Sequence, residues 1–123
     1  MKQFKLIQAY RATDALSHND KLSADTLWGI YFLRKKLFPH WEFQTEREEA
    51  LKKKYSKYAD ENGTLKGDNY LNYVGELTAL ANIEKEIAID EKIKIVITDD
   101  LGLTVEMMEA LEDFVEFEKE RSE

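Results

Sequence analysis

Residues 86–97 read Glu-Ile-Ala-Ile-Asp-Glu-Lys-Ile-Lys-Ile-Val-Ile, and this stretch decides the fold. Isoleucine stands at odd-numbered positions only, at 87, 89, 93, 95 and 97. Successive side chains of a β-strand point to opposite faces, so a period of two predicts a strand. Because the other apolar segments have helical spacing, we expect an α+β fold that is mostly helical, with its β-structure near residues 86–97.

A solitary strand leaves backbone donors and acceptors unpaired, so residues 86–97 need a partner. Asp90-Glu91-Lys92 interrupts the alternation and would fold the stretch into a small antiparallel sheet, a hairpin of 86–89 against 93–97. Two alternatives stay open. The stretch could pair with Lys2–Leu6, or with the same strand of another subunit, in which case Ile93 and Ile95 are interaction residues.

Helical periodicity extends over most of the remaining sequence and predicts helices over residues 5–17, 24–38, 40–58 and 70–84, with a last helix after Thr104. Ser23 and Thr104 are expected to cap the helices that follow them. Pro39, the single proline, removes an amide donor, so we expect one long kinked helix packed on two or three others. The charged tail, residues 117–123, is expected to fray.

The composition bounds the class of protein. With 123 residues, 43% hydrophobic and 35% charged, the chain fits one domain, residues 1–123. It has no cysteine, which excludes disulfides and thiolate chemistry. No apolar run approaches the roughly 20 residues of a membrane span. Since Met1–Ile7 also lacks the apolar core of a signal peptide, we expect a soluble, cytoplasmic protein with no membrane partner.

Charge is unevenly distributed along the chain. Residues 1–40 carry seven basic and three acidic side chains (+4), and residues 41–123 carry eleven and twenty-two (−11), which together give −7. Phosphate contacts need Lys and Arg, so nucleic acid is not an expected partner. An acidic surface suits self-association through opposite ends or a basic partner. Glu109, Glu112 and Glu116 are the candidates for a surface that imitates phosphates.

No catalytic or cofactor motif is present, so the protein is predicted not to be an enzyme and to need no cofactor or metal. His18 and His40 match no metal-binding spacing. Residues 60–63 resemble part of a calcium loop, but the loop positions that need carboxylates would hold Tyr58 and Asn69. Asp90-Glu91-Lys92 and Asp99-Asp100 could serve a small metal-dependent nuclease, but carboxylates are frequent throughout this chain, and we favour a turn or strand end at both places.

Aromatic residues crowd the segment 28–43, at Trp28, Tyr31, Phe32, Phe38, Trp41 and Phe43. Their helical period favours packing in a core, and any that stay exposed would form a protein-binding patch. The candidates for that patch are Trp28, Tyr31, Phe38 and Trp41.

Several segments follow one another in a characteristic order between residues 45 and 117. They are a charged helix that ends in Lys-Lys-Lys-Tyr-Ser-Lys-Tyr (52–58), Asp-Glu-Asn-Gly (60–63), a helix around Tyr73 to Leu80, a Glu-Ile-x-Ile strand, Asp-Asp-Leu-Gly (99–102) and a Met-x-x-Leu-x-x-Phe-Val helix (108–115). In this order and spacing the region resembles small uncharacterised proteins encoded by phages and prophages of Gram-positive bacteria. That family brings no known activity and no site residues.

The resemblance implies a non-enzymatic phage or prophage accessory protein that acts through protein–protein contacts in virion assembly or on a host protein. We expect such a protein in the host cytoplasm or in the virion, as a homo-oligomer or bound to a phage or host partner. One alternative is an acidic inhibitor that imitates nucleic acid and binds a host defence protein. A small metal-dependent nuclease is a more distant alternative.

Overall fold

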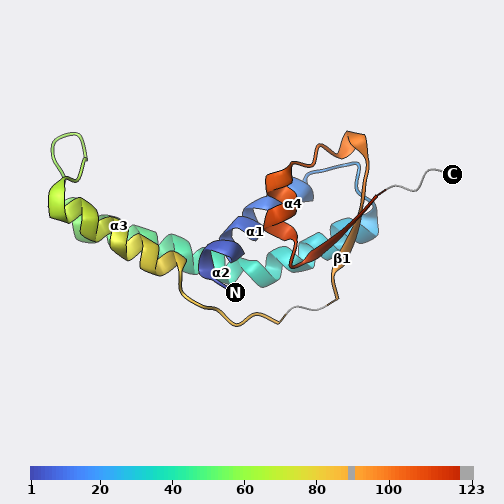
Figure 1. The fold of residues 1–123 in the computed structure, drawn as a ribbon, viewed down its shortest axis with the longest axis horizontal. Coiled ribbons are helices and arrows are strands. Elements are labelled where there is room, and N and C mark those ends of the chain that lie inside the picture. The colour runs from blue at the N-terminus through green and yellow to red at the C-terminus, as the bar shows by residue number, and fades with distance from the viewer. Residues whose placement is uncertain (89–90, 120–123) are drawn as a thin grey trace.

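The computed structural model describes residues 1–88 and 91–119. Its elements follow in this order: α1 (Gln3–Ser17), α2 (Ala24–Ser56), α3 (Gly67–Ala81), β1 (Ile93–Ile97), the short 3₁₀ helix η1 (Asp99–Leu101), α4 (Val105–Leu111) and β2 (Val115–Lys119). Helices dominate and the sheet is small (Figure 1), which confirms the predicted α+β class.

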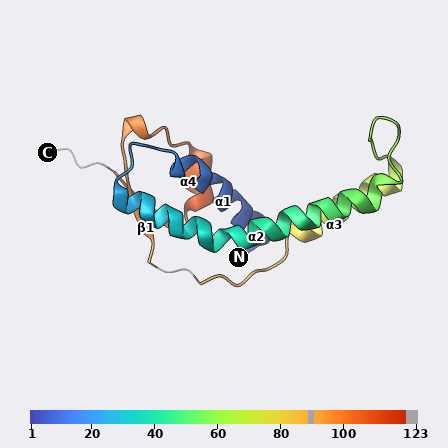
Figure 2. The same ribbon diagram turned by 180° about the vertical axis from the view of Figure 1, so that it is seen from behind.

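Helix α2 runs through the whole molecule and gives it an elongated shape (Figures 1 and 2). Its first half packs into a body with α1, α4 and the sheet, and its second half forms a projecting arm with α3. The helix continues through Pro39, and its axis bends in its central part (Figure 2). Proline has no N–H, so the carbonyl four residues earlier loses its helical partner. The predicted segments 24–38 and 40–58 are therefore one kinked helix.

Both predicted N-caps are confirmed. The Ser23 hydroxyl accepts a hydrogen bond from the Thr26 amide at 3.2 Å, and the Thr104 hydroxyl accepts one from the Met107 amide at 3.1 Å. Each cap satisfies a donor that the first helical turn leaves without a partner. Helix α3 begins at Gly67, three residues earlier than the sequence predicts, and its N-cap residue Lys66 makes no capping hydrogen bond through its side chain.

Strands β1 and β2 pair in parallel, and the predicted antiparallel hairpin is wrong. The Ile93 amide donates to the Phe114 carbonyl at 3.0 Å, and Ile95 is opposite Phe117 in the register. Parallel strands need a crossover connection, which η1 and α4 supply. Residues 86–88 form no strand, and residues 89–90 of the predicted hairpin lie outside the described residues.

The expectation of a frayed tail from residue 117 is wrong for residues 117–119, which belong to β2. Val115 is 2% exposed and Phe117 packs against the core. Burial of these two apolar side chains on one face stabilises the strand, while Glu116 and Glu118 lie on the other face. Residues 120–123 lie outside the part of the chain that the structure describes.

The N-terminus pairs with the segment directly after α3. Lys2 forms an antiparallel bridge with Glu84, and the Lys85 amide donates to the Met1 carbonyl at 2.8 Å. Pairing of residues 86–97 with Lys2–Leu6 is therefore wrong, because α1 already begins at Gln3 and uses the backbone groups of this segment. The bridge fixes the start of the connection between the arm and β1.

Helix α1 lies against both α2 and α4, and the core fills the space between these helices and the sheet (Figure 1). The largest fully buried apolar side chains are Leu6, Leu16, Ile30, Leu37, Ile95 and Leu111.

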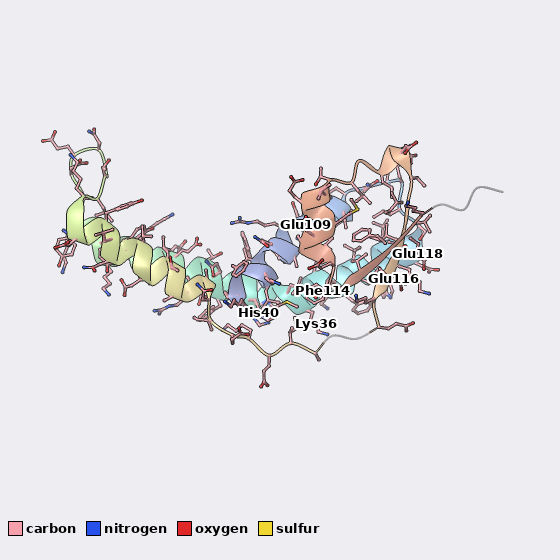
Figure 3. The ribbon with its side chains drawn as sticks, viewed as in Figure 1. Lys36, His40, Glu109, Phe114, Glu116 and Glu118 are labelled. Carbon is pink, nitrogen blue, oxygen red and sulfur yellow. The ribbon has the colours of Figure 1, made fainter. Side chains whose placement is uncertain are left out.

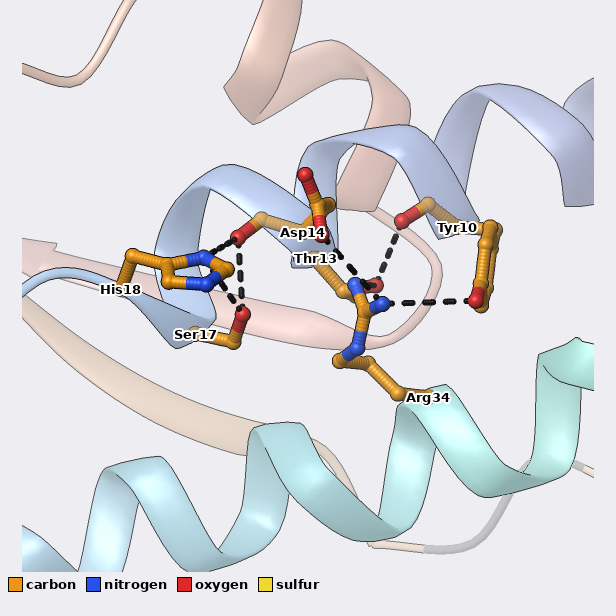
Figure 4. A network of polar contacts seen from close by, with 6 residues as sticks. All are labelled: Tyr10, Thr13, Asp14, Ser17, His18 and Arg34. Carbon is orange, nitrogen blue, oxygen red and sulfur yellow. Dashed lines mark hydrogen bonds and ion pairs between the residues drawn. The ribbon is translucent and has the colours of Figure 1, made fainter.

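A network of polar contacts also joins α1 to α2 (Figure 4). The Arg34 guanidinium donates to the hydroxyls of Thr13 at 3.2 Å and Tyr10 at 3.3 Å, and forms an ion pair with Asp14 at 3.4 Å.

Candidate functional site

Three clustered aromatic side chains on the first half of α2 are exposed to solvent, and we call them the aromatic surface: Trp28, Tyr31 and Phe32. Their exposed fractions are 62%, 48% and 51%. Trp28 stacks on Tyr31 with ring centroids 5.6 Å apart and meets the edge of Phe32 at 4.9 Å. Residues three and four positions apart share a helix face, so all three rings point away from the core. Contiguous exposed apolar groups of this kind mark interaction sites.

A cleft of about 200 Å³ adjoins the aromatic surface where β1 crosses α2, and it is lined by Gly29, Phe32, Leu33, Lys36, Glu91, Ile93 and Phe114. Figure 3 shows Lys36 and Phe114 in this part of the body. Gly29 allows β1 to come close, because a Cβ at this position would lie 3.2 Å from Ile93 Cγ1. The lining of the cleft is mostly apolar and includes one cation, Lys36, and one carboxylate, Glu91. A cleft of this kind can bind an apolar side chain of a partner.

Only part of the predicted aromatic patch is free. Trp41 is half-buried, because it stacks on Tyr10 of α1 at 5.2 Å and the Arg11 guanidinium lies 5.5 Å from its ring centroid. Phe38 is 46% exposed, but it too lies beside Tyr10, at 6.3 Å. Trp41 therefore belongs to the packing of α1 on α2, whereas Phe38 contacts Tyr10 but keeps an exposed fraction close to that of Tyr31. Phe32, which the predicted set omits, lies four residues after Trp28, and this helical spacing is a signal that identifies it.

The side chain of Ile95 is not accessible to a partner, whereas Ile93 lines the cleft beside the aromatic surface, and pairing of this strand with another subunit stays a prediction. Ile95 is 1% exposed and belongs to the core, and Ile93 packs on Gly29. Both side chains lie on the face of the sheet that α2 covers. The opposite face presents Lys94 and Val96 instead, and Val96 is 48% exposed.

The three predicted acidic residues do not form one surface, and Figure 3 shows Glu109 on α4 and Glu116 on β2. Glu109 lies on α4 and Glu112 directly follows the last residue of this helix, and both line a groove between α1 and α4. Glu116 lies on the outer face of β2, opposite Lys94 in the register. Imitation of a nucleic acid backbone needs carboxylates spaced along one face, so this arrangement does not favour the nucleic-acid mimic.

The residues considered as metal ligands have local partners. Asp60 accepts hydrogen bonds from the amides of Asn62 and Thr64, both at 2.9 Å, and Asp100 accepts one from the Thr98 hydroxyl. These contacts are those of turns. Within residues 1–88 and 91–119, no three His, Cys, Asp or Glu side chains lie close enough together to hold a metal ion.

His40 lies near Lys85 and is partly buried. Burial lowers the pKa of the His40 imidazole, and the positive charge of Lys85 lowers it further. The His40 carbonyl accepts a hydrogen bond from the side chain of Gln3 at 2.9 Å, so this position helps to dock α1 on α2. These contacts give His40 a role in packing.

Comparison of the chain with family models, with curated proteins and with solved structures found no match. The resemblance of residues 45–117 to phage and prophage proteins therefore stays a prediction. Across the described residues, no helix has both the length and the apolar character to cross a membrane.

Proposed function

We propose that this chain is a non-enzymatic adaptor that binds another protein through the aromatic surface and the adjoining cleft. The observation that carries the proposal is the exposure of three mutually packed rings beside an apolar cleft. Trp and Tyr dominate the energetics of protein interfaces because they bury a large area at a small cost in conformational entropy. Exposed rings on a helix of a highly charged chain are otherwise unfavourable for solubility.

The residues of this surface indicate which chemical groups a partner would present to it. An apolar side chain fits the cleft, and acidic residues suit its surroundings, because the Lys35 ammonium lies 5.4 Å from the Tyr31 ring centroid and residues 1–40 are net basic. The setting that the resemblance implies is a phage or prophage accessory protein in the host cytoplasm or the virion. The partner is then a virion protein or a host protein.

Cross-linking in infected cells tests the proposal. A photoreactive amino acid at position 32 should capture one partner, which mass spectrometry identifies, and the purified partner should bind the wild-type chain. Substituting Trp28→Ser with Tyr31→Ser should weaken that binding at least about tenfold, as expected for interface anchors.

Val105→Ser is the matched control, because Val105 is also 62% exposed but lies on α4. It should leave binding unchanged. If the Trp28→Ser/Tyr31→Ser variant folds and binds the partner as tightly as the control does, the aromatic surface is not the binding site.

A further inference from the structure

A groove of about 590 Å³ runs between α1 and α4, and we call it the α1–α4 groove; it shares Phe114 with the cleft but contains no residue of the aromatic surface. Its apolar floor consists of Met1, Ala12, Ala15, Met107, Ala110 and Phe114. Helix α4 and the turn after it supply an acidic wall, formed by Glu106, Glu109, Glu112 and Asp113. Lys5 and Arg11 lie on the α1 side.

Cations lie near the acidic wall without forming an ion pair to it: Lys5 and Arg11 line the same groove, and the Lys92 ammonium donates a hydrogen bond to the Glu112 backbone carbonyl at 3.1 Å. No ion pair joins its four carboxylates to any residue that the structure describes. The groove therefore combines an apolar floor, a wall of four carboxylates that form no ion pair within the described residues, and two cations, Lys5 and Arg11, on the other side. It fits a segment that inserts one apolar side chain, with cations on one flank and a carboxylate on the other.

The chain itself carries such a segment at the end of the arm, which we call the arm tip: Lys53, Lys57, Tyr58 and Glu61. Lys53 and Lys57 are exposed and lie four residues apart, on the face of α2 opposite its buried residues Leu51 and Tyr55. Tyr58 is 48% exposed, and the Lys57 ammonium lies 5.0 Å from its ring centroid. Exposed Glu61 follows in the loop.

The other basic run of the chain is unsuited to this role. Arg34 is held in the body by Thr13, Tyr10 and Asp14. Within the arm, Lys54 forms a short contact of 2.8 Å with Glu76, so it too has a partner. Lys53 and Lys57 are exposed and form no ion pair with another described residue, and the same holds for Lys52 beside them.

We propose that the arm tip of one copy docks in the α1–α4 groove of a second copy. Lys53 and Lys57 face Glu109 and Glu112, and the Tyr58 ring enters the apolar floor. The tip and the groove are complementary in charge, since the two lysines oppose the acidic wall and Glu61 is available to Lys5. This contact does not involve the aromatic surface.

The two surfaces lie at separate places in the molecule, one at the far end of the arm and one on the body (Figure 1). Such a contact is heterologous, since a different patch of each copy takes part. Every copy keeps one free tip or groove after the first contact, so assembly continues into chains or closes into rings.

Sedimentation velocity of the purified full chain tests the proposal. The average mass should rise with protein concentration, and added salt should weaken the association. A tip variant (Lys53→Ser, Lys57→Ser and Tyr58→Ser) and a groove variant (Glu109→Lys and Glu112→Lys) should each raise the Kd of self-association at least about tenfold. Circular dichroism checks that both stay folded, and Glu109→Gln with Glu112→Gln is the milder second groove variant.

The decisive sample is the mixture of the two variants. The groove variant keeps an intact tip and the tip variant keeps an intact groove, so together they should form a complex of two chains that grows no further. A wild-type chain that stays monomeric at every concentration overturns the proposal, and so does association that neither variant weakens. The Trp28→Ser/Tyr31→Ser variant should associate as wild type does, and loss of association in that variant also overturns it. A monomer that still binds its partner leaves the proposed function intact.

Discussion

Two glycines inside helices have opposite surroundings. A Cβ at Gly75 would meet nothing within 4 Å, whereas a Cβ at Gly29 would lie 3.2 Å from Ile93 Cγ1. Gly75→Ala should raise the free energy of unfolding by about 0.5–1 kcal/mol, because Ala is the better helix former. Gly29→Ala should gain less or lose stability, since Ile93 must move. Urea denaturation measures both, and equal gains would show that Gly29 is not needed for the approach of β1.

His40 makes stability depend on pH. Because burial and Lys85 lower its pKa in the folded chain, the unfolded chain, with a value near 6.5, takes up the proton first as pH falls. The free energy of unfolding should therefore be unaffected by His40 above about pH 6.5 and should decrease below it. His40→Gln should flatten this part of the pH profile.

Titration of His40 by NMR gives the direct measurement. Lys85→Gln removes the nearby positive charge and should raise the pKa of His40 toward its ordinary value. Lys52→Gln, a change of the same type at an exposed position of the arm, is the control. A pKa of His40 that Lys85→Gln leaves unchanged would contradict the assigned cause.

At the scale of the element, β1 has one buried and one exposed face. Ile95 is 1% exposed and Val96 is 48% exposed. Ile95→Ala should lower the free energy of unfolding by about 2–5 kcal/mol through loss of burial and a cavity. Val96→Ala should change it by no more than about 0.5 kcal/mol, as surface substitutions usually do. Chemical denaturation separates the two, and similar costs would mean that the faces are assigned wrongly.

At the scale of the whole molecule, the body and the arm differ in burial. The arm has only Leu51, Tyr55 and Leu80 as buried apolar residues in the described chain, and none of them belongs to the core cluster of the body. Segments with few buried contacts open at a lower free energy. The amides of residues 74–80 in α3 should therefore exchange hydrogen faster than those of residues 6–16 in α1.

Hydrogen–deuterium exchange with mass spectrometry measures this difference. Leu80→Ala should speed exchange in α3 and leave α1 unchanged, whereas Leu111→Ala, in the body, should affect α1. Equal protection of the two helices, or a response of α1 to Leu80→Ala, would show that arm and body unfold together.

The sequence by itself determined the local structure. The helices were predictable because their determinants lie only a few positions apart in the chain. These determinants are the helical period of the apolar residues, the caps Ser23 and Thr104, and the loss of a hydrogen bond at Pro39. The same holds for β1, whose period of two is visible in residues 93–97. The sequence also identified Trp28 and Tyr31 as part of the candidate site, because both belong to the aromatic segment 28–43.

Only the tertiary structure decided which strand pairs with β1 and which aromatic rings stay exposed. Strand β2 has the alternation of Val115 and Phe117, but within so charged a tail this short pattern becomes a strand only through burial against the core. Trp41 is covered because Tyr10 of α1 stacks on it, while no ring of another element stacks on Trp28 among the ring contacts of the described residues. Both outcomes depend on contacts between segments far apart in the chain, which local patterns do not specify.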